Sequence, residues 1–390
     1  MLTKRDLRPV WAEINLDNLK NNISEVRRVV KKDTLVCAVI KANGYGHGAV
    51  DIAATLLSNG ADRLAVATLT EAMELRRAAV DAPLLVLGYT PEEQAHIVIE
   101  NNILQTVYSL SQAKELSEAA KTLNNTVKLH LKIDTGMSRL GFNVSDETIE
   151  EIKEISMLSN VEIEGIYTHF ATADEEDKSF TLLQFNRFKG LIERLEAIDI
   201  FIPIKHVSNS AAIIDLPEMN LDMVRAGIML YGLYPSKEVN HNAVNLKQVM
   251  SLKARVSQVK NLPPNTGVSY GLVYKTEGER KIATLPIGYA DGFTRLLTGK
   301  VKVSINGKKI PIVGRICMDQ SMADATGLEV KAGDEVIIFG EDTKVAPTVD
   351  DFAEILKTIN YEIVCMVGRR VPRVYLENNK LLHIRDNLLE

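Results

Sequence analysis

Residues 34–48 read TLVCAVIKANGYGHG, in which an apolar, β-branched run ends at a lysine, Lys41. A short apolar run without alternation is typical of a strand buried on both faces of a parallel sheet. The glycines at 44, 46 and 48 allow the backbone that follows to approach a ligand closely. Taken alone, Lys41 is as consistent with a charge at the solvated end of a strand as with an active-site residue. Tyr45 and His47 within the same glycine-rich loop favour a site.

The composition is that of an ordinary globular chain. Of 390 residues, 46% are hydrophobic and 25% are charged, and the formal net charge is −5. This charge argues against a nucleic-acid or membrane-surface protein, which would normally carry a basic face. No apolar run is long enough for a membrane span, and the N-terminus lacks a signal-peptide core. The cysteines Cys37, Cys317 and Cys365 are too far apart for a disulfide framework or a metal site. We therefore expect a cytoplasmic protein without a metal.

Short apolar runs alternate with amphipathic helical stretches between residue 34 and about residue 230. Eight strands separated by helices predict a (β/α)8 TIM barrel. A doubly wound sheet is the rival, but its GxGxxG fingerprint is missing after the first strand. The predicted strands are 34–40, 62–67, 84–88, 103–108, 127–133, 163–169, 203–208 and 222–226.

The fifth of these strands, VKLHLKID, alternates strictly between apolar and polar residues. Period-two alternation places His130, Lys132 and Asp134 on one face. In a barrel this polar face would line the interior and lead to the catalytic end. An edge strand with one solvated face is the alternative.

The pattern changes after residue 240, where strand-like runs are broken by Gly, Pro and Asn around one helical stretch, TVDDFAEILKTIN. This pattern is typical of a mainly β domain. We therefore expect a barrel domain over residues 1–240 and a mainly β domain over residues 241–390, an α/β protein overall.

Chemistry in such barrels lies at the carboxyl ends of the strands. Loops after strands seven and eight often hold a phosphate there, and Ser210 and the backbone near Gly227 suit that role. A lysine at the first strand, a phosphate cradle at the last two and an arginine between them suit pyridoxal phosphate. The residues at these ends are Lys41, Tyr45, Arg139, His169, His206, Asn209, Ser210, Arg225, Gly227 and Ile228.

With these residues in place, the sequence resembles the alanine racemases over roughly residues 10–380. The lysine loop AVIKANGYGHG carries the likeness in the first half. In the second half VSYG (268–271), LPIGYADG (285–292) and GRICMDQ (314–320) carry it. The resemblance implies a pyridoxal 5'-phosphate enzyme and a homodimer with shared active sites.

The resemblance also implies a role for each matching residue. Lys41 would be the Schiff-base lysine and one acid/base, and Tyr270 from the partner subunit the other. The implied cofactor-binding residues are Lys41, Tyr45, His169, Asn209, Ser210, Arg225, Gly227, Ile228 and Tyr361. Those implied for substrate are Arg139, Tyr270, Tyr289, Cys317, Met318 and Asp319, with His206 and Lys132 (often a carbamate in this family) in support.

The implied function is interconversion of L- and D-alanine by two-base α-proton transfer, supplying D-alanine for peptidoglycan. Arg225 would face the ring nitrogen, where an arginine cannot accept a proton. This argues against a decarboxylase of basic amino acids, which resembles the racemases in fold but carries an acidic group there. A protein that only binds pyridoxal phosphate is disfavoured by the second domain. A racemase acting on serine or on several amino acids stays open.

Overall fold

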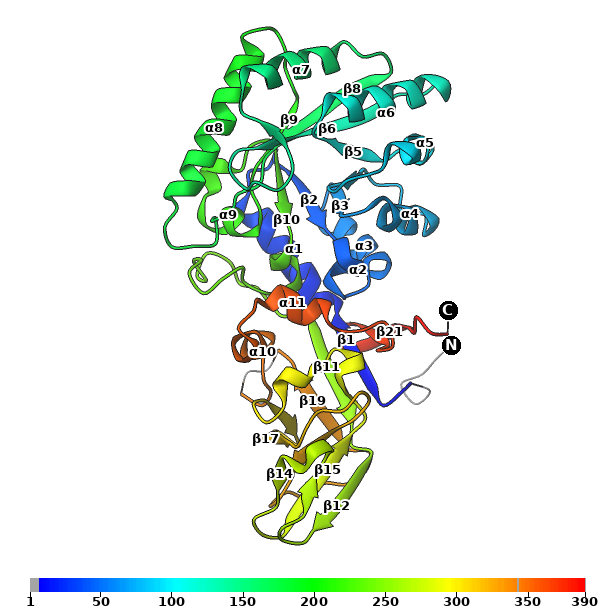
Figure 1. The fold of residues 1–390 in the computed structure, drawn as a ribbon, viewed down its shortest axis with the longest axis vertical. Coiled ribbons are helices and arrows are strands. Elements are labelled where there is room, and N and C mark those ends of the chain that lie inside the picture. Colours follow the sequence, from blue (N-terminus) through cyan, green and yellow to red (C-terminus); the bar gives the residue numbers. More distant parts are fainter. Residues whose placement is uncertain (1–6, 342–343, 390) are drawn as a thin grey trace.

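The computed structural model describes residues 7–341 and 344–389; residues 1–6, 342–343 and 390, which the two predicted domains include, lie outside this description. Figure 1 shows a barrel of strands and helices above a narrower β-rich part. The expected (β/α)8 barrel followed by a mainly β domain is therefore confirmed. In the part of the chain that the structure describes, no helix has both the length and the apolar character needed to cross a bilayer.

Eight parallel strands form the barrel in the order β10-β2-β3-β4-β5-β6-β8-β9. The ring closes between β9 and β10 through two backbone bonds, from Asp222 N–H to the Lys205 carbonyl and from Arg225 N–H to the Ser208 carbonyl, both 3.0 Å. The strands are β2 (Leu35–Val39), β3 (Arg63–Val66), β4 (Leu84–Val86), β5 (Leu104–Val107), β6 (Val127–Asp134), β8 (Val161–Tyr167), β9 (Ile204–His206) and β10 (Met223–Ala226). Each lies within two residues of its predicted start.

Helices cover the outside of this barrel, as Figure 1 shows for α4 to α8. No long helix follows β10, and α1 (Leu16–Val29), which precedes the first barrel strand, packs beside α3 and α9. The others are α3 (Ala49–Ser58), α4 (Leu69–Arg77), α5 (Ala95–Glu100), α6 (Leu110–Thr122), α7 (Asp146–Ser156), α8 (Ser179–Glu196) and α9 (Ser210–Asp215). Single turns are η1 (Glu92–Gln94), η2 (Pro217–Met219) and η3 (Ile228–Tyr231), and the short β7 (Phe142–Asn143) pairs with β6.

The β-rich part is built on a ten-stranded sheet in the order β12-β15-β18-β17-β16-β19-β11-β1-β20-β21. Its strands are β1 (Val10–Asn15), β11 (Met250–Arg255), β12 (Gln258–Leu262), β15 (Arg280–Leu285), β16 (Lys302–Ile305), β17 (Lys308–Val313), β18 (Ser321–Asp324), β19 (Glu335–Phe339), β20 (Arg373–Glu377) and β21 (Lys380–Arg385). The remaining elements are β13 (Gly267–Val268), β14 (Tyr274–Lys275), η4 (Tyr270–Leu272), η5 (Tyr289–Asp291), η6 (Arg295–Leu297), α10 (Val349–Leu356) and α11 (Asn360–Cys365).

Both ends of the described chain meet in this sheet. β1 pairs antiparallel with β11 and parallel with β20, so the first strand lies between two strands from the second half of the chain. The pattern after residue 240 gives no sign of this, because the pairing joins segments far apart in sequence. The division between residues 240 and 241 stays a prediction.

The hairpin β20–β21 also reaches back to the loop after Lys41. Arg373 Nε donates to the Gly46 carbonyl at 3.0 Å, and the Tyr375 hydroxyl donates to the His47 carbonyl at 2.9 Å. Residues 373 and 375 lie on the same face of β20 because side chains alternate along a strand. Asp51, buried at the start of α3, accepts bonds from Tyr375 (3.0 Å) and Arg385 (2.6 Å). The end of the chain therefore fixes the lysine loop.

Gly48→Ala tests this contact. Gly48 has φ +95°, and a Cβ there would lie 1.9 Å from the Tyr375 hydroxyl. We expect the free energy of unfolding to fall by about 1–3 kcal/mol, because an added methyl group must displace a packed ring. Urea denaturation measures the change. Gly278→Ala is the control, because a Cβ there meets nothing within 4 Å; an equal loss in both variants would contradict the argument.

Candidate active site

A cavity of about 320 Å3 opens at the carboxyl ends of the barrel strands. Four of its lining residues are basic and none is acidic, which suits an anionic ligand. Its lining residues are Val39, Lys41, Tyr45, Ala67, Leu87, Gly88, Lys132, Arg139, Leu140, Tyr167, His169, Asn209, Ser210, Arg225, Gly227, Ile228 and Tyr361.

Lys41 begins α2 (Lys41–Tyr45), which is a turn of left-handed rather than right-handed backbone. Ala42, Asn43, Gly44 and Tyr45 all have positive φ, between 51° and 61°. Two side chains hold this turn: Glu71 Oε1 accepts the Ala42 N–H at 2.6 Å, and Asn43 Oδ1 accepts the Ala49 N–H at 2.9 Å. The turn carries the Lys41 side chain from the end of β2 into the cavity.

Burial lowers the pKa of Lys41, and the Arg139 guanidinium lowers it further. The neutral amine is therefore more accessible near neutral pH than for an ordinary lysine. Lys132 is in a similar position: burial, Arg225 and Arg139 lower its pKa well below the usual value. Its Nζ lies 4.8 Å from the centroid of the Tyr167 ring and has no hydrogen-bond partner among the described residues. This amine is available to an anionic group.

Arg225 is buried, with 4% of its surface exposed, and donates five hydrogen bonds. Nη1 donates to His206 Nδ1 at 2.9 Å and to the His206 carbonyl at 3.0 Å. Nη2 donates to His169 Nδ1 at 3.2 Å and to the carbonyls of residues 168 and 207 at 2.8 and 3.0 Å. Burial lowers the pKa of Arg225 to about 10, which leaves it charged at neutral pH.

Ser210 and Gly227 form a small cradle with Tyr45 and Tyr361 in the lining of the cavity. The Ser210 hydroxyl accepts the Gly227 N–H at 2.9 Å. A Cβ on Gly227 would lie 3.1 Å from the Tyr45 hydroxyl, so a side chain would fill the space in front of it. The rings of Tyr45 and Tyr361 are 6.1 Å apart. Hydroxyl groups and a bare backbone are what a phosphate needs.

The structure brings together ten of the eleven predicted residues that belong to the barrel. These ten, which all line the cavity, are Lys41, Tyr45, Lys132, Arg139, His169, Asn209, Ser210, Arg225, Gly227 and Ile228. His206 lies behind Arg225 and reaches the cavity through it. Tyr361, from α11, completes the lining.

The other five predicted residues lie on the β-rich part and do not line the cavity: Tyr270, Tyr289, Cys317, Met318 and Asp319. Tyr270 is 69% exposed in η4, just before β14, which Figure 1 places toward the lower end of the molecule. Tyr289 and Met318 are exposed on adjacent loops, joined by a 3.0 Å bond from the Tyr289 N–H to the Cys317 carbonyl.

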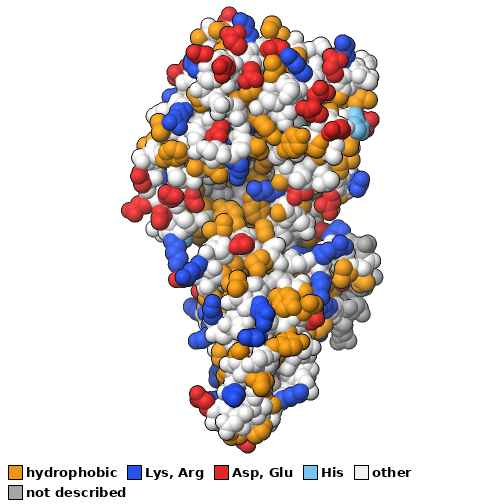
Figure 2. Space-filling view, in the orientation of Figure 1, with side chains coloured by type: hydrophobic (Ala, Val, Ile, Leu, Met, Phe, Trp, Pro, Cys, Tyr) orange, Lys and Arg blue, Asp and Glu red, His pale blue; other side chains and the backbone are white. Residues whose placement is uncertain are grey.

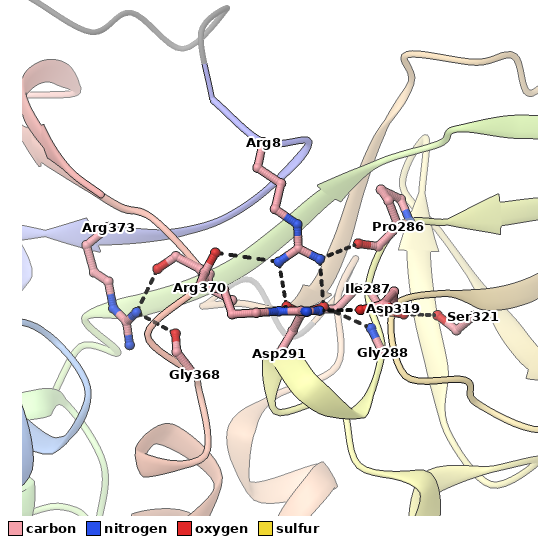
Figure 3. Close-up of polar contacts among 11 residues, drawn as sticks. Arg8, Pro286, Ile287, Gly288, Asp291, Asp319, Ser321, Gly368, Arg370 and Arg373 are labelled. Carbon is pink, nitrogen blue, oxygen red and sulfur yellow. Dashed lines mark hydrogen bonds and ion pairs between the residues drawn. The ribbon is translucent and has the colours of Figure 1, made fainter. Parts of the chain in front are cut away.

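Figure 3 shows the ion pairs that hold these loops. Asp291, fully buried, accepts Arg8 Nη2 at 2.8 Å and Arg370 Nε at 2.9 Å. Arg370 also donates to Asp319 at 2.7 Å. Asp291 ends η5 and Asp319 follows Met318, so one network fixes the segments that carry Tyr289 and Met318 on the surface.

Sequence reasoning missed Tyr167. Its ring stacks on His206 at 4.6 Å and lies under both Lys132 and Arg225. The signal was present, because residues 167 and 169 lie two apart in the predicted strand 163–169 and His169 was already predicted to face the site. Leu87, Gly88 and Leu140 were missed as well, and an apolar lining residue carries no comparable signal.

The fold and the site define a barrel enzyme that keeps a buried lysine and a buried arginine in one cationic cavity. The models of the N-terminal and C-terminal domains of alanine racemase match residues 14–235 and 249–375. Alanine racemase 1 of Clostridium acetobutylicum is 50% identical over 98% of this chain and 99% of its own length.

Comparison with solved structures gives the same family. The alanine racemase of Clostridium difficile 630 has a TM-score of 0.95 and is 47% identical, with both chains covered completely. That of Bacillus anthracis, solved with bound L-Ala-P, has a TM-score of 0.91 and is 37% identical over 98% of each chain. The chain belongs to the alanine racemase family and is an isomerase.

Glu71→Gln tests how the lysine turn is held. One carboxylate oxygen accepts the Ala42 N–H and the other accepts the Ala67 N–H at 2.6 and 2.7 Å. Glutamine has one acceptor oxygen, so one N–H loses its partner, and we expect stability to fall by about 1–3 kcal/mol. Turnover should fall as well. Glu74→Gln on the exposed face of α4 is the matched control; if it has the same effects, the turn does not depend on Glu71.

Proposed function

We propose that this protein interconverts L- and D-alanine with two acid/base groups, Lys41 of one subunit and Tyr270 of the partner subunit. The observation that carries the proposal is a single cavity with the amine of Lys41, which burial makes easier to deprotonate, and a buried Arg225. Racemisation removes the α-proton on one face and returns a proton on the other, so groups from two sides serve it directly.

The cavity residues fit pyridoxal 5'-phosphate as the cofactor. Ser210, Gly227, Ile228, Tyr45 and Tyr361 would hold its phosphate in the cradle, and Lys41 would hold its carbonyl carbon. Once bound, this group would withdraw electrons and so acidify the α-carbon of alanine. The unpartnered, buried Nζ of Lys132 would add carbon dioxide and lose a proton to form a carbamate, which would brace Arg139. Asn209 lines the same cavity.

Three residues of the cavity would each have a separate role. Arg139 would bind the substrate carboxylate at the open side of the cavity. Arg225 would face the ring nitrogen and, because a guanidinium cannot accept a proton, would leave that nitrogen unprotonated. His169 accepts from Arg225 through Nδ1, so its Nε2 carries the proton in the neutral ring and can donate to Tyr270 of the partner subunit.

A homodimer is proposed because Tyr270 does not line the cavity of its own chain. Exposed apolar side chains on the β-rich part support this assembly: Tyr270, Leu272, Val273, Tyr289, Leu296 and Met318. Figure 2 shows apolar and basic side chains across this lower part, with few acidic ones. Tyr289, Cys317, Met318 and Asp319 would shape the substrate path of the partner subunit. We propose cytoplasmic supply of D-alanine to peptidoglycan, as family membership implies.

The direct test is to incubate the purified protein with L-alanine and with L-serine and to follow each D-enantiomer by chiral chromatography. We expect D-alanine to accumulate to about equal amounts of both enantiomers, because the two have the same free energy in water. Conversion of L-serine at a comparable rate would widen the substrate class. No D-alanine from L-alanine, with pyridoxal phosphate added, would contradict the function.

Mixing two inactive variants tests the shared site. Lys41→Ala and Tyr270→Ala should each abolish turnover, but a hybrid dimer has one site that carries both changes and one that carries neither. Random exchange makes about half of the dimers hybrid, so we expect about a quarter of wild-type activity. Each variant mixed with itself is the control. If exchange is verified and activity does not return, Lys41 and Tyr270 do not act across subunits.

A further inference from the structure

We propose that His130 and Glu164 are positioning residues that fix the proton arrangement around Arg225 from inside the barrel. The inference rests on the proposed function only in taking Arg225 as the group that faces the cofactor ring. The relay is defined as Arg225, His206, His130 and Glu164. None of these is more than 7% exposed.

The relay is continuous. Arg225 Nη1 lies 2.9 Å from His206 Nδ1, and His206 Nε2 lies 2.9 Å from His130 Nδ1. His130 Nε2 lies 3.0 Å from Glu164 Oε2. Glu164 is held in turn by Arg63, the first residue of β3, and by Lys128, near the start of β6, at 3.1 Å. The relay therefore runs from the cavity toward the amino-terminal ends of the strands.

The chemistry of its two ends sets the direction of every bond. Burial opposes ionisation of Glu164, but hydrogen bonds from His130, Arg63 and Lys128 lower its pKa to about 2, so it accepts only. His130 must then carry its proton on Nε2. Burial lowers the pKa of His130, which keeps the ring neutral and leaves Nδ1 free to accept from His206 Nε2. His206 Nδ1 is thereby left to accept from Arg225.

This direction supplies Arg225 with a distant counter-charge. Arg225 forms no ion pair with a carboxylate among the described residues, although a buried cation without compensation is costly. A carboxylate beside Arg225 would compensate the charge but would also stand near the ring nitrogen and favour its protonation. Two neutral imidazoles between Arg225 and Glu164 allow charge compensation without protonation of the ring nitrogen. The carboxylate polarises the chain of hydrogen bonds and so stabilises the charge of Arg225, while Arg225 rather than the carboxylate stands beside the cofactor ring.

The surrounding backbone makes room for the relay. A Cβ on Gly165 would lie 2.3 Å from His130 Nδ1, so only glycine fits opposite this ring. The pairing of β6 with β8 shifts register between Leu129 and His130, which brings Gly165 opposite His130. Tyr167 stacks on His206 with an interplanar angle of 10° and fixes that ring from the other side. The rings are thus held at hydrogen-bonding distance by packing.

The matched variants His130→Gln and His130→Leu test the relay. Glutamine and leucine have similar volumes, but glutamine at position 130 can accept from His206 and donate to Glu164, whereas leucine can do neither. Nitrogen-15 spectra of the full-length, histidine-labelled protein report each tautomer. The His206 signals are assigned by their loss in His206→Gln. We expect one Nε2–H form of His206 in the wild type and in His130→Gln, and loss of the single form in His130→Leu.

The second readout is pyruvate formed from alanine per racemisation event. We expect this ratio to rise about tenfold in His130→Leu, a change of about 1.4 kcal/mol in the relative barriers, and to stay near wild type in His130→Gln. Glu164→Gln, which removes only the charge, should raise the ratio less. Glu162→Gln is its control, because Glu162 also pairs with Lys128 but lies on the surface.

The outcomes of these experiments distinguish failure of the relay from failure of the proposed racemase function. If His130→Leu and His130→Gln give the same His206 spectrum, the relay is overturned whether or not the protein racemises alanine. If the spectra change as expected but the pyruvate ratio does not, the relay exists and Arg225 does not control reaction specificity, which overturns its functional half. Equal effects of Glu162→Gln and Glu164→Gln would assign the change to surface charge rather than to the relay.

Discussion

Four consecutive left-handed residues after Lys41 are the constraint on which the site depends. L-residues avoid this conformation by roughly 1–2 kcal/mol each, and only Gly44 escapes that cost. The turn persists because Glu71 accepts the Ala42 N–H, and Asn43, Arg373 and Tyr375 bond the backbone of the segment that follows, at Ala49, Gly46 and His47. Because the turn reverses the chain abruptly, Lys41 and Tyr45, which are close in sequence, both line the cavity.

The second organising feature is a cavity lined by cationic side chains and by no carboxylate. Lys41, Lys132, Arg139 and Arg225 all line the cavity, and burial lowers the pKa of Lys41, Lys132 and Arg225. Cations that share one cavity repel one another, and an anionic ligand among them offsets this repulsion. The tendency to bind an anion and the accessibility of the neutral lysine amine thus have the same physical origin.

The sequence predicted the barrel well because each buried strand carries its own local signal. The strand-end rule likewise located Lys41, His169 and Arg225, since parallel strands end at one edge. The left-handed turn was not predictable, because Ala42 and Tyr45 give no sign of positive φ. Nor was the pairing of β1 with β20, which joins residues more than 350 positions apart in the chain. Gly165 shows the same limit: its role is to leave room for a ring on another strand.

The bonds from β20 to the lysine loop can form only late in the synthesis of the chain. The carbonyls of Gly46 and His47 receive their partners from residues 373 and 375, close to the end of the 390-residue chain. During synthesis, this hairpin leaves the ribosome after all eight barrel strands have emerged. A nascent barrel therefore holds the Lys41 turn through Glu71 and Asn43 alone. The loop gains its bonds to Arg373 and Tyr375 only after β20 has emerged, so a product of translation that stops before β20 contains the whole barrel sequence without these two bonds.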